Sequence, residues 1–271
     1  MGRAAERPAL VIKSVTSRDN PAYREMARLM GSGQVRKKEG MSVLDGAHLV
    51  AAFLDSGRDA EAVMVNAAGL ADAQIAKLVE RSSGARVTLL SDALFKSIST
   101  VDSPTGVIAL VKTPVGKAAP RDAKLVLLLE DIQDPGNVGT LLRSAAGAGA
   151  GHVMLSGGCA FAWSPKVLRA AMGAHFALEI VEGADLAAWI PGYRGISVAL
   201  SGHAAKSLYD LDLAKPCALL VGNEGGGLSP ALESAATVRA KIPMPGRLES
   251  LNAGTAGSIA LFECVRQRAR T

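Results

Sequence analysis

An unbroken run of apolar residues, Leu125–Leu129, constrains the fold of this chain more than any other stretch. Five consecutive large aliphatic side chains are typical of a strand buried on both faces, as in a parallel sheet. Turn-forming residues follow at 134–136, and a helical pattern begins at Val138. Asn137 stands at the junction, where its side chain is suited to capping the helix, and Arg143 follows nearly two turns later. A polar residue at a strand-to-helix turn predicts a ligand site at the edge of an α/β sheet.

Apolar strands and helical patterns alternate along most of the chain, which predicts an α/β fold. A helix is expected from Pro21 to about Met30, followed by a basic loop at 35–40. The prolines at 114 and 120 lie in a stretch without apolar pattern that is typical of a linker. The expected organisation is an N-terminal extension at 1–16, an α/β domain at 17–112, a linker at 113–123 and a second, mostly parallel α/β domain at 124–271.

The composition indicates a globular protein rather than a membrane or disulfide-rich one. The chain has 271 residues, of which 49% are hydrophobic and 20% charged, enough for one large domain or two ordinary ones. The three cysteines form no C-x-x-C pair and the four histidines lack metal-ligand spacing, so no metal site is predicted. The longest charge-free run, 144–165, contains five glycines and is a poor membrane span. We expect a protein of the reducing cytoplasm.

The net charge of +5 is concentrated at the start of the chain. Residues 1–40 contain nine Lys and Arg against four acids, whereas the other residues balance at 21 against 21. A basic segment on a neutral body favours a polyanionic partner, nucleic acid first, although a solvated basic helix without a partner is the alternative. The candidate RNA-binding residues are Arg18, Arg24, Arg28, Arg36, Lys37 and Lys38.

Three polar or glycine-rich loops follow predicted strands in the second domain. The first is the turn after Leu125–Leu129, the second spans 222–230, and the third spans 242–257. A glycine-rich loop alone is more often a turn than a site. Known phosphate motifs are absent, because Gly116-Lys117 is followed by Ala118 and the glycines at 147–151 follow a helix rather than a strand. ATP and NAD sites are therefore disfavoured.

Together the three loops resemble the motifs of the SpoU/TrmH family of RNA ribose 2′-O-methyltransferases, in the SPOUT superfamily. DPGNVGTLLRSA (134–145) is similar to the first motif, LLVGNEGGGLSP (219–230) to the second and IPMPGRLESLNAGTAGSIALFE (242–263) to the third. The resemblance covers 124–268. SRDNPAYREMARL and LDGAHLV carry a weaker resemblance to the ribosomal-protein-like, RNA-binding substrate domain of the family. Asp45 departs from the glutamate that is common there.

The resemblance implies a fold and a cofactor that composition does not predict. SPOUT domains contain a deep trefoil knot, and S-adenosyl-L-methionine binds at the knotted loops. On this resemblance the cofactor-binding residues are Gly222, Ile242, Leu251, Leu220, Pro243 and Gly246. Glycines allow a backbone to approach a ligand closely, which gives the glycines at 222–227 a role beyond turning. The resemblance also implies a homodimer that forms through the knotted domain and shares its active sites.

The same resemblance assigns the catalytic residues, namely Arg143, Asn137, Glu224, Ser250 and Asn252. The family gives the activation of the ribose hydroxyl to the arginine, but a guanidinium with a pKa above about 12 is a poor proton acceptor. Arg143 is therefore expected to stabilise alkoxide charge or to grip a phosphate, and a structural ion pair is the alternative. Glu224 is expected to pair with Arg143 across the dimer or to assist substrate binding, with a helix-start carboxylate as the alternative.

The expected activity is that of an RNA (ribose-2′-O-)-methyltransferase, in the EC 2.1.1 class. The resemblance favours 23S ribosomal RNA, with guanosine as the target, and transfer RNA is the second substrate. A non-catalytic RNA-binding protein that keeps the fold is the hypothesis from another class, and the intact motif residues argue against it. The motifs build the methyl-transfer site rather than the base reader, so they do not identify the nucleotide.

Overall fold

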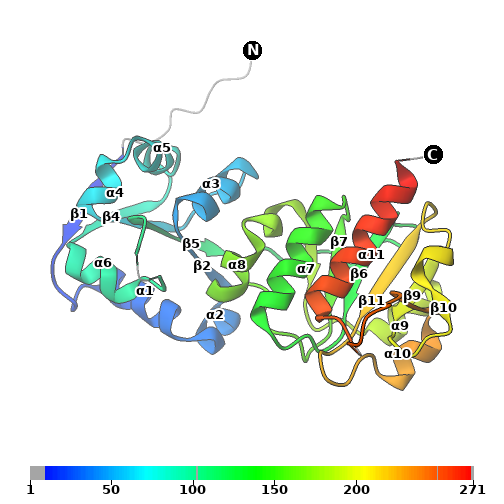
Figure 1. Ribbon diagram of the computed structural model, residues 1–271. Helices are drawn as coiled ribbons and strands as arrows, with labels where there is room; N and C mark the ends of the chain where they lie inside the picture. The colour runs from blue at the N-terminus through cyan, green and yellow to red at the C-terminus, as the bar shows by residue number, and fades with distance from the viewer. Residues whose placement is uncertain (1–9, 102, 249, 270–271) are drawn as a thin grey trace, which may run out of the picture. The chain divides into compact units, whose positions relative to one another are not determined.

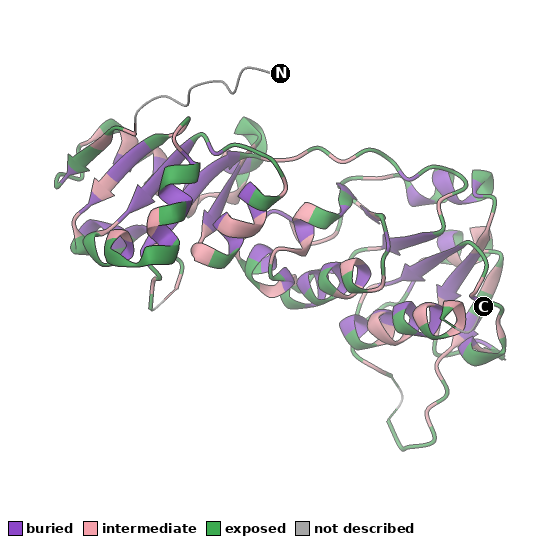
Figure 2. Ribbon diagram, turned by 90° about the horizontal axis from the view of Figure 1, so that it is seen from above, coloured by how far each residue is buried: buried purple, intermediate pink, exposed green. Residues whose placement is uncertain are grey.

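The computed structural model describes residues 10–101, 103–248 and 250–269. It divides into two compact units (Figure 1). The first comprises residues up to Pro114 together with 163–165, and the second comprises 115–162 and the residues from Lys166 onward. Buried residues concentrate on the strands of both units, whereas the helices expose their outer faces (Figure 2). Residues 1–9 of the predicted extension lie outside the described part of the chain. No helix among the described residues is long and apolar enough to cross a membrane.

The first unit contains one mixed sheet with strand order β1-β4-β3-β5-β2. Strands β1, β4 and β3 pair in parallel, whereas β5 runs antiparallel to both β3 and β2. Met26 and Leu29 pack with Phe95 and Ile108 in its core. The elements are β1 (Ile12–Val15), α1 (Pro21–Gly31), α2 (Gly33–Glu39), β2 (Met41–Asp45), α3 (Ala47–Asp55), β3 (Ala62–Val65), α4 (Ala67–Ala71), α5 (Ala73–Arg81), β4 (Arg86–Leu90), α6 (Asp92–Ile98) and β5 (Val107–Lys112).

Two predictions for the first unit are wrong. Ile12–Val15 lies in the predicted extension but forms β1, an edge strand of the sheet. The expected basic loop at 35–40 is the helix α2, which begins after the cap Ser32, whose Oγ accepts the Val35 N–H, and ends at Gly40 in the left-handed conformation. Both caps supply hydrogen-bond partners for backbone groups that a short helix leaves unpaired, so seven residues suffice.

The second unit contains one sheet with strand order β10-β12-β9-β11-β6-β7-β8. Every pairing described in this sheet is parallel, as the sequence predicts. The elements are β6 (Leu125–Leu129), α7 (Pro135–Gly147), β7 (His152–Leu155), α8 (Pro165–Ala171), η1 (Ala174–Ala177), β8 (Glu179–Val181), α9 (Leu186–Trp189), η2 (Ile190–Gly192), β9 (Ile196–Leu200), β10 (Lys206–Ser207), η3 (Leu208–Asp210), β11 (Cys217–Val221), α10 (Pro230–Ala235), β12 (Val238–Lys241) and α11 (Ala253–Arg268).

The apolar strand that opens the second unit lies in the interior of its sheet. β6 pairs with β11 on one side and β7 on the other, and all five of its residues are buried. This burial on both faces explains why the run contains only aliphatic residues.

The helices α7 and α11 pack side by side on this sheet, although more than a hundred residues separate them (Figure 1). Gly257 allows this packing, because a Cβ there would lie 2.3 Å from Leu141 Cδ2. Ser144 Oγ and Ser258 Oγ lie 2.7 Å apart and join the two helices further along. The last helix thereby returns the chain to the centre of the sheet.

The start of α7 differs from the prediction. Asp134, not Asn137, caps this helix, because the Asp134 carboxylate accepts the Asn137 N–H at 2.8 Å and Pro135 occupies the first helical position. The helix thus begins before Val138, and Asn137 lies inside its first turn. The Asn137 side chain is released from capping and is free to bond elsewhere.

The predicted linker is not a free spacer. Ala119 is buried, and its carbonyl accepts the Trp189 Nε1–H at 3.0 Å. The Arg121 guanidinium lies over the Trp189 ring, 5.3 Å from the ring centroid. These contacts hold the segment after Val115 against the second unit.

Candidate active site

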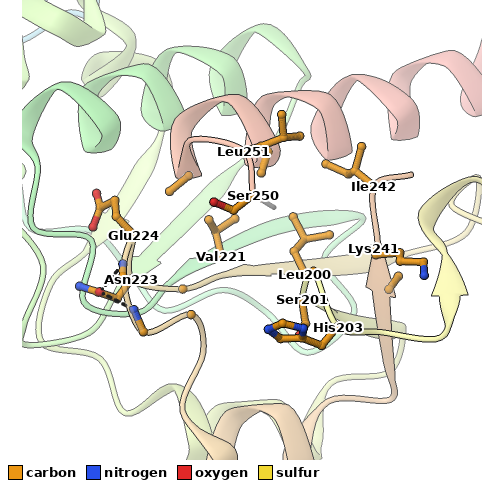
Figure 3. A pocket seen from close by; sticks show the side chains of 18 of the residues that line it. Leu200, Ser201, His203, Val221, Asn223, Glu224, Lys241, Ile242, Ser250 and Leu251 are labelled. Atoms are coloured by element: carbon orange, nitrogen blue, oxygen red, sulfur yellow. Dashed lines mark hydrogen bonds between the residues drawn. The ribbon is translucent and has the colours of Figure 1, made fainter. Parts of the chain in front are cut away.

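A pocket of about 410 Å³ lies at the carboxyl ends of three neighbouring strands, β9, β11 and β12, beside the start of α11 (Figure 3). This is where open parallel sheets bind ligands, and the volume is that of a small-molecule site. The residues that line it are Leu200, Ser201, Gly202, His203, Val221, Gly222, Asn223, Glu224, Gly225, Gly226, Gly227, Glu233, Ala240, Lys241, Ile242, Met244, Ser250, Leu251, Ala253 and Ala256.

The loop after β11 is held in a fixed turn by Asn223. Its Oδ1 accepts the N–H groups of Gly225 at 2.9 Å and Gly226 at 3.0 Å, and its Nδ2 donates to the Asp131 carbonyl. The turn folds back on Gly222, where a Cβ would lie 2.3 Å from backbone atoms of Gly227 and Leu228. Only glycine fits at this position, so the wall of the pocket is bare backbone.

Three side chains from the three predicted motifs form one hydrogen-bonded relay. Asn252 Nδ2 donates to Asn137 Oδ1 at 2.9 Å, and Asn137 Nδ2 donates to Glu224 Oε1 at 2.8 Å. Asn252 also caps α11, because its Oδ1 accepts the Thr255 N–H at 3.1 Å. A carboxylate only accepts hydrogen bonds, so Glu224 fixes the orientation of the Asn137 amide, which in turn fixes that of Asn252.

Hydrogen bonding keeps the Glu224 carboxyl ionised. Burial opposes its ionisation, but the bond from Asn137 and the backbone N–H groups of Glu224, Gln133 and Asp134 outweigh burial and lower its pKa. The pocket therefore carries a fixed negative charge at the end where the three motifs meet.

The structure brings most of the predicted site residues to this pocket. Gly222, Ile242, Leu251, Glu224 and Ser250 line it, and the relay attaches Asn137 and Asn252 to it. The Ser250 hydroxyl points toward the end where Glu224 lies (Figure 3).

Four other predicted residues lie outside the lining. Leu220 is fully buried in the core of the second unit, where its side chain packs. Pro243 and Gly246 are exposed on the loop before α11. Arg143 is exposed on α7 and makes no hydrogen bond or ion pair with the described residues. The alternative of a structural ion pair for Arg143 therefore has no partner within the described chain.

The sequence prediction missed the wall that follows β9. Leu200–His203, as well as Glu233 and Lys241, line the pocket without belonging to a recognised motif. One feature of the sequence could have indicated this wall. β9 is a predicted parallel strand, and the carboxyl ends of neighbouring parallel strands meet at the edge of the sheet where ligands bind. The sequence does not specify which strands are neighbours.

The basic residues of the first unit differ in their availability. Arg24 pairs with Asp19, and Arg28 pairs with Glu39. Arg36 is only 5% exposed, and its Nη1 donates to the Leu29 and Met30 carbonyls at the end of α1. Arg36 thus stabilises the helix pair instead of presenting its charge to solvent, contrary to the prediction. Arg18, Lys37 and Lys38 are exposed.

A family model described as the SpoU rRNA Methylase family matches residues 124–262. The chain belongs to this family. A second model, the MRM3-like substrate binding domain, matches residues 20–109. The family predicted from the three loops is confirmed, and with it the class of enzyme, an RNA ribose 2′-O-methyltransferase.

Two curated relatives of this SpoU-family chain are similar over almost the whole length. The 23S rRNA (guanosine(2553)-2′-O)-methyltransferase of Bacillus subtilis is 29% identical, covering 93% of this chain and 98% of the relative. The 23S rRNA (uridine(2479)-2′-O)-methyltransferase of Streptomyces viridochromogenes is 26% identical, covering 99% and 97%. Both names specify the 2′-oxygen of 23S rRNA, but they specify different bases.

A crystal structure of an AdoMet-bound rRNA methyltransferase from Sinorhizobium meliloti is similar to this SpoU-family chain in fold. It has a TM-score of 0.84 and 29% sequence identity, covering 94% of this chain and 98% of that one. AdoMet is the cofactor that the motifs predict.

Proposed function

We propose that this chain transfers a methyl group from S-adenosyl-L-methionine to a ribose 2′-hydroxyl of 23S ribosomal RNA. The observation that carries the proposal is the relay Asn252–Asn137–Glu224, which joins all three family motifs at one end of a ligand-sized pocket. Guanosine is the favoured target, and transfer RNA is the second substrate. The proposed location is the cytoplasm.

The pocket fits the cofactor in shape and chemistry. The bare backbone at Gly222 admits a close ligand, and Ile242 and Leu251 offer apolar walls to an adenosyl group. Backbone groups beside these three residues would hold the adenine and ribose by hydrogen bonds. When bound, S-adenosylmethionine supplies an electrophilic methyl group on a sulfonium. The Glu224 carboxylate lies at the pocket end that suits this positive charge.

The other site residues orient the acceptor. The Ser250 hydroxyl and the Asn137 and Asn252 amides are uncharged groups that can position a ribose without neutralising the carboxylate. Arg143 stabilises developing charge on the 2′-oxygen or grips the adjacent phosphate. Because Arg143 does not line the pocket of its own chain, the proposed homodimer brings the partner's Arg143 to the site.

The proposed trefoil knot has support in the topology of the second unit. The chain leaves β11, crosses β9 to form β12, and then returns so that α11 packs on α7 and β11. The pocket lies among the segments that make this return. The exposed Phe262 on α11 is one apolar contact available to a second copy of the chain.

In vitro methylation tests the proposal. Purified protein is incubated with labelled S-adenosylmethionine and either 23S rRNA or transfer RNA, and 2′-O-methylated nucleotides are mapped. We expect one site in 23S rRNA. Arg143→Ala should abolish transfer while the cofactor Kd, measured by calorimetry, stays within about threefold. If the wild-type protein binds no cofactor in calorimetry, a non-catalytic RNA-binding role replaces the proposal.

A further inference from the structure

The structure brings together two cysteines that lie far apart in the sequence. Cys217 lies at the start of β11 and Cys264 near the end of α11, 47 positions later, yet their Sγ atoms lie 3.5 Å from each other. Both side chains are fully buried, and both are free thiols. The sulfur atoms are in contact, so a bond between them requires only a small movement of the two side chains.

A guanidinium lies beside this pair. Arg268, the last residue of α11, donates from Nη2 to the carbonyls of Lys124 at 2.9 Å and Lys215 at 3.1 Å, which hold it in place. The same nitrogen lies 3.5 Å from Cys217 Sγ. A positive charge next to a thiol favours the thiolate, which is the form that reacts with oxidants.

The two thiols differ in acidity. The hydrogen bond from the Cys264 thiol, together with the Arg268 guanidinium, outweighs burial and lowers the pKa of Cys217. The same hydrogen bond and burial raise the pKa of Cys264. Cys217 is therefore the nucleophile of the pair, and Cys264 is the neighbouring thiol that can react with its oxidised form.

The third cysteine lies in a different environment. Cys159 is partly buried, and its Sγ donates to the Leu129 carbonyl at 3.3 Å. Burial raises the pKa of Cys159, which keeps this thiol in its protonated and less reactive form. Cys159 therefore provides a comparison within the same chain.

The position of the pair connects it to the pocket. α11 packs on β11, and the chain between Cys217 and Cys264 contains the glycine loop after β11 and the whole third motif. Gly222 and Leu251, which line the pocket, lie in this stretch. A covalent link between the two cysteines would close the stretch into a loop, which restricts the unfolded chain and so stabilises the fold.

We propose that hydrogen peroxide converts Cys217 and Cys264 into a reversible disulfide that fixes α11 to β11. The Cys217 thiolate attacks a peroxide oxygen, the oxygen–oxygen bond breaks, and a sulfenic acid forms with release of hydroxide, which takes up the proton that Cys217 had lost. The Cys264 sulfur then attacks the Cys217 sulfur, the sulfur–oxygen bond breaks, and the hydroxyl group leaves with the Cys264 proton as water. Two thiols are oxidised, and one peroxide is reduced to two waters.

The burial of the pair selects a small oxidant. Hydrogen peroxide is little larger than water, and Cys264 lies about one turn before the end of α11. Helix ends open locally more readily than helix centres do, which gives the oxidant a path to the sulfur atoms.

Peptide mapping of the full chain tests the proposal. The reduced protein is treated with hydrogen peroxide, its remaining thiols are blocked with N-ethylmaleimide in denaturant, and it is digested without reduction. We expect a peptide pair linked through Cys217 and Cys264, with Cys159 recovered as the maleimide adduct. Dithiothreitol should release the linked pair.

Thermal unfolding measures the consequence for the fold. Oxidation should raise the Tm of the second unit by about 5 °C or more, and dithiothreitol should reverse the rise. Cys264→Ala should lose both the linked peptides and the rise, whereas Cys159→Ser keeps the pair and should behave as the wild type does. The peptide map of the wild type needs no variant, so it decides the matter even if Cys264→Ala folds poorly.

Four results would overturn the inference. The first is the recovery of Cys217 and Cys264 as maleimide adducts after peroxide treatment. The second is a sulfinic acid at Cys217 without a linked peptide, and the third is a disulfide that joins two chains on a non-reducing gel. The fourth is an intramolecular link that leaves the Tm unchanged or lowers it. None of these measurements uses methyl transfer, so the proposed function stands or falls separately.

Discussion

At the scale of single residues, Asn137 has the most constrained role in the site. Its backbone N–H completes the cap of α7, its Oδ1 faces Asn252 and its Nδ2 faces Glu224. Aspartate at this position would set a second carboxylate against Glu224, and leucine would remove the hydrogen bonds that Asn137 makes to Asn252 and to Glu224. An amide is the only side chain of this size that donates on one side and accepts on the other.

Another buried residue makes stability depend on pH. His175 is 1% exposed, and burial lowers its pKa to about 4, although its Nε2 bonds the Ala162 carbonyl. The unfolded chain therefore binds more protons than the folded one between about pH 4 and about pH 6.5. The free energy of unfolding is full above that window and decreases as the pH falls through it.

His175→Gln should remove this dependence, because glutamine can donate to the same carbonyl without titrating. The loss of stability between pH 7 and pH 5 should be about 2 kcal/mol smaller in the variant than in the wild type. Denaturant unfolding followed by tryptophan fluorescence measures this difference. His203→Gln, at an exposed position, should behave as the wild type does. Equal pH dependence in His175→Gln and wild type would refute the argument.

The sequence identifies several site residues correctly but does not specify which groups their side chains contact. The sequence predicts Asn137 as the cap of α7, yet Asp134 caps this helix because Pro135 starts it one turn earlier. The sequence predicts Arg36 as an RNA contact, yet its guanidinium bonds the carbonyls at the end of α1. In both cases the type of side chain indicates that it forms polar contacts. The group that it contacts depends on where the backbone places it, which the sequence does not specify.

At the scale of elements, the glycine loop after β11 shapes the pocket wall. Gly222→Ala should weaken cofactor binding, because its Cβ would lie 2.3 Å from the backbone of Gly227 and Leu228. Gly225→Ala is the control within the same loop, since its Cβ would meet only Asn223 Oδ1, at 3.6 Å. We expect the cofactor Kd to rise at least about tenfold in the first variant and to change less than about threefold in the second. Calorimetry measures both, and equal affinities would contradict this account of the wall.

Helices and strands can be predicted from the sequence where strong local signals, such as apolar runs and capping residues, indicate them. β6 and the helix after Asn252 were foreseen because an aliphatic run and a capped pattern are strong signals. The helix α2 was missed, although Ser32 and Gly40 are ordinary start and stop residues, because the basic run between them has little apolar periodicity. β1 was missed because an edge strand with two exposed residues resembles an extended terminus.

At the scale of the whole molecule, the charge is uneven but partly neutralised. Several cations of the first unit are paired or buried, so the charge available to RNA is smaller than the sequence count suggests. Lys37 and Lys38 are exposed neighbours at the end of α2, where a helix terminus also favours positive charge.

Replacing Lys37 and Lys38 together by glutamine should weaken RNA binding and reduce its salt dependence. Each lost phosphate contact lowers the slope of log K against log salt by about 0.7 to 0.9. The double variant should therefore bind with a slope smaller by up to about 1.8. Lys77→Gln with Lys96→Gln removes the same charge from α5 and α6 and serves as the control. If both pairs change the slope equally, net charge and not a defined surface governs binding.

The complete pocket was beyond the reach of the sequence. Its motif residues were foreseen through the family resemblance, but the wall from Leu200 to His203 depends on β9 lying between β11 and β12. Strand order is a property of the whole sheet, and no local pattern encodes it.

The walls of the pocket come from stretches of chain that run from Leu200 to Ala256, most of the last quarter of the protein. A ligand that binds only the folded form raises the free energy of unfolding, by about 2.7 kcal/mol at about one hundred times its Kd. The cofactor should therefore stabilise the fold in addition to supplying the methyl group. We expect the bound cofactor to stabilise the C-terminal segment, so that the resistance of the purified protein to proteolysis rises with the concentration of S-adenosylmethionine.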